Sequence, residues 1–344
     1  MMKDKVKKRI FYFDEVRALA ILFVILCHTT TMYQPYNYTN LHLAIPGLLN
    51  MLGWVGVPLF FMISGALLLN REYALKDFFK RRFTRILYPF IFWMFITLTL
   101  QYVFLGSGYS QLFKVFFGVK RYTWFIWVMM GIYLILPVIN SFIREFKMTG
   151  VKYFLAIWFF TIILQTIGKY PLFKLDLASF AGFLGYVVLG YYLANAEFKL
   201  PDKLLIIIGP ILYFAFLAMN WYCQGHKIFI SDSAYTSVFV VMAAVGVFIF
   251  FRCISDYSEK NTQSITAKIH NKIVNGRLGS IIISISICSY GMYFLNSLIL
   301  RFVKEWHITT FKMLPVIFIS TVLISWLVMV VLNKIPAIRK YIGT

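Results

Sequence analysis

The chain has 344 residues, of which 60% are hydrophobic, and its mean hydropathy is +0.76. Soluble domains contain about 45–50% apolar residues, so this composition excludes an ordinary soluble protein and indicates a polytopic membrane protein. The net charge of +21 comes from 34 Lys and Arg against 13 Asp and Glu, and in a membrane protein such an excess is first a question of orientation.

Apolar segments separated by charged or Gly/Pro/Asn-containing loops predict an all-α bundle of about ten transmembrane helices in a single domain over 1–344. The predicted spans are 11–33, 50–70, 87–105, 122–142, 151–168, 178–195, 204–222, 234–252, 280–300 and 313–332. With the N-terminus inside, the cytoplasmic segments hold 24 Lys and Arg and the external segments hold 9. Both termini are therefore predicted to be cytoplasmic. This topology explains the basic excess without a nucleic-acid partner.

The first span carries Arg17 near its start and His28 near its end. Each costs roughly 2.5–3.5 kcal/mol in lipid, so such residues usually face a protein interior and mark a functional site. They are eleven residues apart, which returns a helix to within about 20° of the same face after a rise of ~16 Å. Asp14 lies on the same face of the helix, and we expect the three side chains to face one common space. In the simpler alternative, Arg17 snorkels to the interface and His28 is an interior histidine.

The second span, GWVGVPLFFMISGALLLN, is rich in small residues, which lets neighbouring helices approach closely. Its small residues are Gly53, Gly56, Ser64 and Gly65. The densest basic stretch follows, REYALKDFFKRRFTRILYP, and it includes Arg82 and Arg85. This stretch is either a positive-inside anchor on anionic headgroups or a clamp for phosphate, which guanidinium groups suit.

Three later stretches bear on the site. Trp124, Trp127 and Tyr133 fit interface anchoring better than substrate stacking. The segment from Asp256 to Gly279 has the composition of a solvated cytoplasmic loop. The ninth span is unusually polar and offers side chains that can line an internal cavity. These are Ser284, Ser286, Ser289, Tyr290 and Asn296.

The sequence contains no GxSxG elbow, Walker motif, HExxH or paired-carboxylate cluster. Its four cysteines lack the spacing of a metal site or a disulfide framework, and we interpret them as small buried apolar residues. No metal site and no permanently bound cofactor are expected. His28, with Arg17, is therefore the best-placed candidate for chemistry, since a neutral imidazole suits general-base work near pH 7.

Several stretches, in order, resemble the multi-pass acyltransferase family 3 of bacterial membranes, whose members O-acylate surface glycans. The opening span has the Arg-X10-His pattern of that family, R17-ALAILFVILC-H28. The other matching stretches are GVPLFFMISGALLL, KRRFTRILYP, WFIWVMMGIYLILP and SYGMYFLNSLIL.

The resemblance implies that Arg17 and His28 are the essential catalytic pair and that acyl-CoA, with acetyl-CoA as the expected form, is the cytoplasmic donor. It implies further that the acceptor is a sugar hydroxyl of a surface glycan or its lipid-linked precursor. It also implies a bacterial cytoplasmic-membrane location among lipids. The candidate substrate-binding residues are Asp14, Ser64, Arg82, Arg85, Trp124, Tyr290 and Asn296. The chain departs from the family at Asn296, where relatives often have His. The alternative function is export of a polysaccharide or lipid-linked sugar without acyl transfer.

Overall fold

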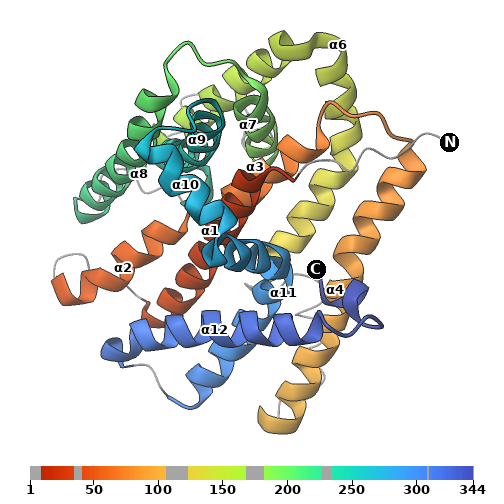
Figure 1. The fold of residues 1–344 in the computed structure, drawn as a ribbon. Coiled ribbons are helices and arrows are strands. Elements are labelled where there is room, and N and C mark those ends of the chain that lie inside the picture. Colours follow the sequence, from red (N-terminus) through yellow and green to blue (C-terminus); the bar gives the residue numbers. More distant parts are fainter. Residues whose placement is uncertain are drawn as a thin grey trace.

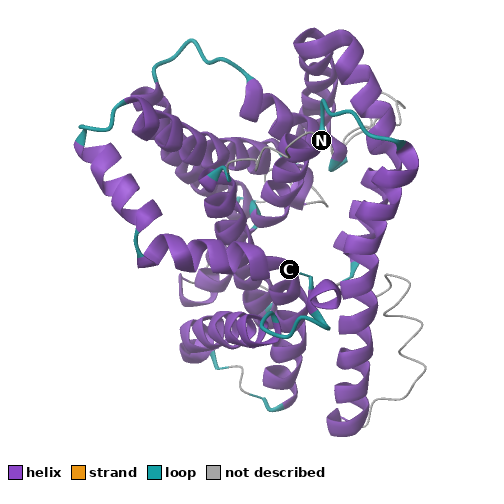
Figure 2. Ribbon diagram, turned by 45° about the vertical axis from the view of Figure 1, so that its right-hand side comes forward, coloured by secondary structure: helices purple, strands orange, loops and turns teal. Residues whose placement is uncertain are grey.

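The computed structural model describes residues 9–34, 41–105, 123–167, 182–226, 234–307 and 310–343. Within these ranges all regular structure is helical (Figures 1 and 2). The long helices are α1 (Phe11–Thr30), α2 (Leu41–Gly53), α3 (Gly56–Leu68), α4 (Leu75–Leu105), α6 (Trp124–Ile167), α7 (Leu184–Asn195), α8 (Asp202–Gly225), α9 (Val238–Lys260), α10 (Ile265–Asn275), α11 (Arg277–Glu305) and α12 (Leu314–Leu332). The short ones are η1 (Thr31–Tyr33), η3 (Ala234–Thr236), η4 (Phe311–Met313) and α13 (Arg339–Ile342).

Eight helices or helix pairs among the described residues are long and apolar enough to cross a membrane. Their outer surfaces carry large apolar side chains, as in α4, where Phe95 is 69% exposed, and α8, where Phe214 is 62% exposed. Monomeric soluble proteins rarely expose contiguous patches of this kind. The prediction of an all-α polytopic bundle is therefore confirmed.

The difference between these eight and the ten predicted spans lies in α6 and α7. α6 has 44 residues, about 66 Å at 1.5 Å per residue, which is twice the ~30 Å of a bilayer core. The backbone leaves helical geometry at Lys147 (φ 49°, ψ −141°), and Figure 1 shows α6 bending near the top of the view. The bend falls between the predicted spans 122–142 and 151–168. α7 has only 12 residues, so its crossing stays a prediction.

α1 is the central helix of the bundle. Its sequence contains no Gly or Pro, and it packs against α2, α3, α9, α11 and α12. The glycines of α3 permit close helix contacts, as the sequence predicted, and those of α7 do the same. A Cβ atom on Gly56 would lie 2.7 Å from the Ala20 carbonyl oxygen of α1, and one on Gly65 would lie 1.7 Å from the Val187 oxygen of α7. α3 is thus held between α1 and α7 by backbone contact.

The prediction of a solvated loop from Asp256 to Gly279 is wrong. α9 continues to Lys260, α10 covers Ile265–Asn275, and α11 begins at Arg277. The Ser264 side chain caps α10 by accepting a hydrogen bond from the Ala267 amide. Ala267 and His270 are buried, so one face of this polar segment packs against α9 and α11, which composition alone did not indicate. The four cysteines are buried and unpaired, as predicted.

Candidate active site

A cavity of about 600 Å³ lies between α1, α3, α4, α6 and α11. α1 contributes Asp14, Arg17 and Val24, while α4 contributes Arg82 and Arg85. The distance from Asp14 to Val24 corresponds to ten residues, or about 15 Å along the α1 axis. The cavity therefore runs along much of the length of α1, and the residues that line it come from segments far apart in the sequence.

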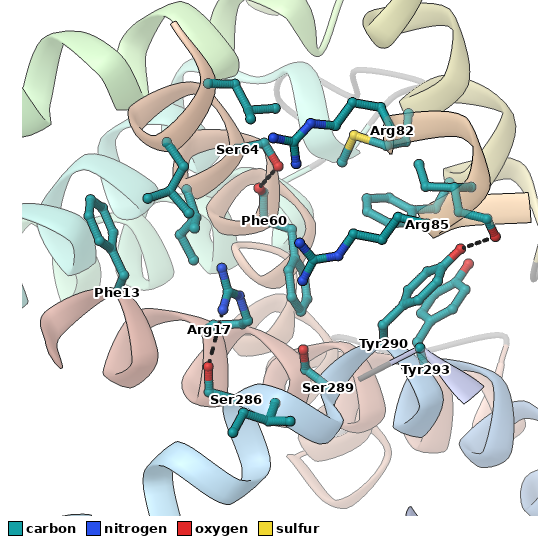
Figure 3. Close-up of a pocket in the computed structure, with 18 of the residues that line it drawn as sticks. Phe13, Arg17, Phe60, Ser64, Arg82, Arg85, Ser286, Ser289, Tyr290 and Tyr293 are labelled. Carbon is teal, nitrogen blue, oxygen red and sulfur yellow. Dashed lines mark hydrogen bonds between the residues drawn. The ribbon is translucent and has the colours of Figure 1, made fainter. Parts of the chain in front are cut away.

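The cavity is strongly basic. Five arginines line it, namely Arg9, Arg17, Arg71, Arg82 and Arg85, and Asp14 is the one carboxylate among its described lining residues. Figure 3 shows Arg17 on one side of the space and Arg82 and Arg85 reaching toward it from the other. This excess of guanidinium groups in a partly buried cavity favours an anionic ligand, and phosphate oxygens match the planar fork of arginine.

Asp14 organises two of these arginines. Its carboxylate accepts hydrogen bonds from Nε and Nη2 of Arg9 at 2.6 and 2.7 Å, and from the Ser286 hydroxyl at 2.6 Å. Arg17 Nη1 donates to the same hydroxyl over 3.4 Å. The hydrogen bonds to Asp14 raise the pKa of Arg9. Asp14 is therefore occupied by Arg9 and Ser286, which leaves the charges of Arg71, Arg82 and Arg85 without a carboxylate among the described lining residues.

Two predicted binding residues, Ser64 and Tyr290, also line this cavity. The Ser64 hydroxyl donates to the Phe60 carbonyl at 2.9 Å, and the Tyr290 hydroxyl donates to the Ile86 carbonyl at 3.1 Å (Figure 3). Both hydroxyl protons are thus donated to backbone carbonyl groups of the protein. Each oxygen can still accept a hydrogen bond from a ligand.

His28 lies in a second, much smaller chamber of about 10 Å³. His28 Nδ1 lies 2.7 Å from Oδ1 of Asn296, a fully buried residue of α11. The Asn296 amide nitrogen donates to the carbonyls of Met292 and Tyr293 at 2.9 and 2.7 Å. Since that amide nitrogen faces the backbone, Oδ1 faces the imidazole and Nδ1 is the donor. The lone pair of a neutral His28 is consequently on Nε2.

Trp124 lines the His28 chamber and not the basic cavity. Its ring packs against those of Phe183 and Tyr235, with centroids 5.4 Å away in each case. Tyr133 is buried and lines the basic cavity, so the interpretation of Tyr133 as an interface anchor is wrong. The sequence of an apolar span does not show which side of the helix an aromatic residue of that span will face.

The expectation that Asp14, Arg17 and His28 look into one space requires correction. Asp14 and Arg17 line the basic cavity, whereas His28 lines the small chamber. Four side chains border both spaces and so separate them: Val24, Val57, Phe125 and Tyr293. Helical periodicity placed the three residues on one face of α1 correctly. It gave no information about side chains that other helices place across that face.

The sequence did not single out several residues of the site. Arg9 was counted only among the Lys and Arg of the predicted cytoplasmic segments, and Tyr293 only as part of a matching stretch. Ser286 was noted in the polar ninth span, and its contacts with Asp14 and Arg17 confirm that this polarity serves the cavity. Ser284, from the same group, instead accepts a hydrogen bond from Trp326 at 3.0 Å. Among the described residues, no three His, Cys, Asp or Glu side chains gather as a metal site would require.

Comparison with known proteins supports the resemblance. The sequence profile of acyltransferase family 3, described as an acyltransferase domain, matches residues 10–330. This range contains α1 to α11 and nearly all of α12, and with them every candidate site residue. No curated protein and no solved structure matches the chain.

Proposed function

Because the chain belongs to acyltransferase family 3 and is an acyltransferase, we propose that it transfers an acetyl group from cytoplasmic acetyl-CoA to a sugar hydroxyl of a bacterial surface glycan or its lipid-linked precursor. One observation carries the proposal. A cavity lined by five arginines and one carboxylate ends against the four side chains that border the His28 chamber.

The basic cavity would hold the donor. The nucleotide end of CoA carries phosphate groups, which Arg82 and Arg85 would bind as charge-assisted forks. Arg17 and His28 are ~16 Å apart along α1, too far to touch one small substrate. The long pantetheine arm of CoA can bridge such a distance and bring the thioester toward Val24, at the end of the cavity nearest His28.

His28 would act as the general base, with Nε2 as the proton acceptor. The acceptor hydroxyl would approach from the side of Trp124 and Tyr235, whose aromatic rings line the chamber. As Nε2 takes the hydroxyl proton, the sugar oxygen forms a bond to the thioester carbonyl carbon. The carbon–sulfur bond then breaks, and the CoA thiolate leaves and takes the proton from the imidazolium. A positioned general base typically contributes 10²–10⁴-fold to such a step.

The test compares cells that express the wild-type chain with cells that express His28→Gln, a substitution that keeps hydrogen bonding and removes the proton-accepting nitrogen. Mass spectrometry of surface glycans should detect acetyl groups only with the wild-type chain. Inverted membrane vesicles from the wild-type cells should release free CoA from acetyl-CoA, and those from the His28→Gln cells should not. Glycan that reaches the surface unacetylated, with no release of CoA, would overturn the proposal in favour of export.

A further inference from the structure

Four apolar or aromatic side chains lie between the basic cavity and His28, and they come from three other helices as well as α1. Val24 belongs to α1, Val57 to α3, Phe125 to α6 and Tyr293 to α11. All four are buried and border both spaces. We propose that this partition, made of Val24, Val57, Phe125 and Tyr293, selects the acyl group by length. It would pass an acetyl group to His28 and exclude longer chains. This inference rests on the proposed function.

The partition separates charged from uncharged surroundings. None of the five arginines that line the basic cavity lines the His28 chamber. Among the described residues that line this chamber, His28 is the one basic side chain. Moving a phosphate into such surroundings would cost far more than leaving it with the arginines. The phosphates of the donor therefore stay in the basic cavity, and only the neutral acyl end can enter the partition.

Packing fixes the position of the partition. The Phe125 and Tyr293 rings have centroids 5.6 Å apart. Behind them, Phe61 lies 5.2 Å from Phe125 and Phe294 lies 5.4 Å from Tyr293. On the α1 side, a Cβ atom on Gly56 would lie only 3.0 Å from Cγ2 of Val24. These contacts hold Val24, Phe125 and Tyr293 in place, so the partition can widen only slightly.

The volume beyond the partition sets the length limit. The His28 chamber measures about 10 Å³, which is roughly the space that one water molecule requires. On the α2 side the chamber is bounded by close packing of α2 on α1, since a Cβ atom on Gly53 would lie 2.6 Å from the Cys27 sulfur. A site of this size can admit a methyl group at most, after a slight adjustment of its walls, and has no room for further methylenes. One extra methylene typically changes discrimination by about 10- to 200-fold.

The experiment measures CoA release from acetyl-CoA, propionyl-CoA and butyryl-CoA in inverted membrane vesicles, with His28→Gln vesicles as the blank. The quantity of interest is the ratio of kcat/KM for propionyl-CoA to that for acetyl-CoA, because differences in expression or folding cancel within each variant. For the wild-type chain this ratio should be about 0.1 or lower.

Two variants, Val57→Ala and Val24→Ala, remove methyl groups from the partition and so widen the passage to His28. Each should raise the ratio about tenfold. The matched control is Val16→Ala, which removes the same atoms from another buried valine of α1 and should leave the ratio unchanged. Val24→Ala keeps the test decisive if Val57→Ala fails to fold.

Three outcomes would overturn the proposal, and they can be distinguished. Equal use of all three donors by the wild-type chain, or the same change of ratio in Val16→Ala as in the partition variants, would remove the length selection and leave acyl transfer intact. No CoA release above the blank from any donor would overturn the proposed function and the selection with it.

Discussion

Asn296 fixes the imidazole of His28 from a position 268 residues away in the chain, through a hydrogen bond of 2.7 Å from Nδ1 to Oδ1. Because the amide nitrogen of Asn296 is held by two backbone carbonyls of its own helix, the oxygen cannot turn away without losing those bonds. Asn in place of the His that the family resemblance led us to expect thus preserves a hydrogen-bond partner for the imidazole of His28. In the proposed mechanism, Asn296 would therefore act as a positioning residue for His28.

Asn296→Ala should lower kcat roughly tenfold with little change in KM for acetyl-CoA. A net hydrogen bond is worth about 0.5–1.5 kcal/mol, and about 1.4 kcal/mol is tenfold in rate. Asn296→His should retain most of the activity, since an imidazole nitrogen can accept the same bond. The measurement is steady-state CoA release by each variant. Equal activity of Asn296→Ala and wild type would remove the positioning role.

His28→Ala should reduce kcat by about 10²–10⁴-fold, the contribution of a positioned general base. His28→Gln should be nearly as inactive, because glutamine lacks a nitrogen that accepts a proton. His226→Ala is the matched control, since His226 is exposed at the end of α8 and lines neither cavity. Activity of His28→Ala close to wild type, with His226→Ala also active, would exclude His28 from the mechanism.

Arg82→Gln combined with Arg85→Gln should raise the KM for acyl-CoA at least about tenfold and change kcat less, because hydrogen bonds to charged groups contribute about 1.5–3 kcal/mol and uniform binding appears in KM. Lysine at both positions should restore part of the affinity. Arg81→Gln separates the two interpretations of the basic stretch, since Arg81 is exposed beside Arg82 but does not line the cavity. An equal effect of Arg81→Gln would favour the membrane anchor over the phosphate clamp.

The predicted orientation requires the basic cavity to open toward the cytoplasm. Cysteine introduced at Thr310, in a segment predicted to be external, should react with a membrane-impermeant maleimide added to intact cells. Cysteine at Thr262 should react only after the cells are opened. The native cysteines are buried, so the unmodified chain provides a low background. If only Thr262→Cys were labelled from outside, the bundle would have the opposite orientation in the membrane. Cytoplasmic acyl-CoA could then not reach the arginines.

Much of the fold could be predicted because membrane spans depend on local properties, namely length and hydropathy. The α10 helix was missed because its stability comes from packing two small or polar residues, Ala267 and His270, against neighbouring helices. The bend at Lys147 was anticipated only as a boundary between two spans. Composition describes a segment by itself and does not report the surface on which it packs.

The site was predictable to the extent that it follows from one helix. Arg17 and His28 could be found from the cost of placing them in a span, and their common face follows from helical periodicity. The division between them could not be predicted, because Val57, Phe125 and Tyr293 are ordinary apolar or aromatic residues in their own spans. Only the arrangement of α3, α6 and α11 around α1 brings them together.

The contact between α3 and α7 also limits which substitutions the chain can accept. A Cβ atom would lie 1.7 Å from a backbone oxygen of the other helix at Gly65 and 2.0 Å from one at Gly190, whereas nothing lies within 4 Å of one at Gly131. In a saturation-mutagenesis library selected for acetylated glycan, positions 65 and 190 should admit glycine alone. Position 131 should accept alanine, which costs a helix about 0.5–1 kcal/mol less than glycine. Recovery of alanine at position 65 would show that α3 can move away from α7. Substitutions at positions 65 and 190 could then change the width of the basic cavity, although neither residue lines it.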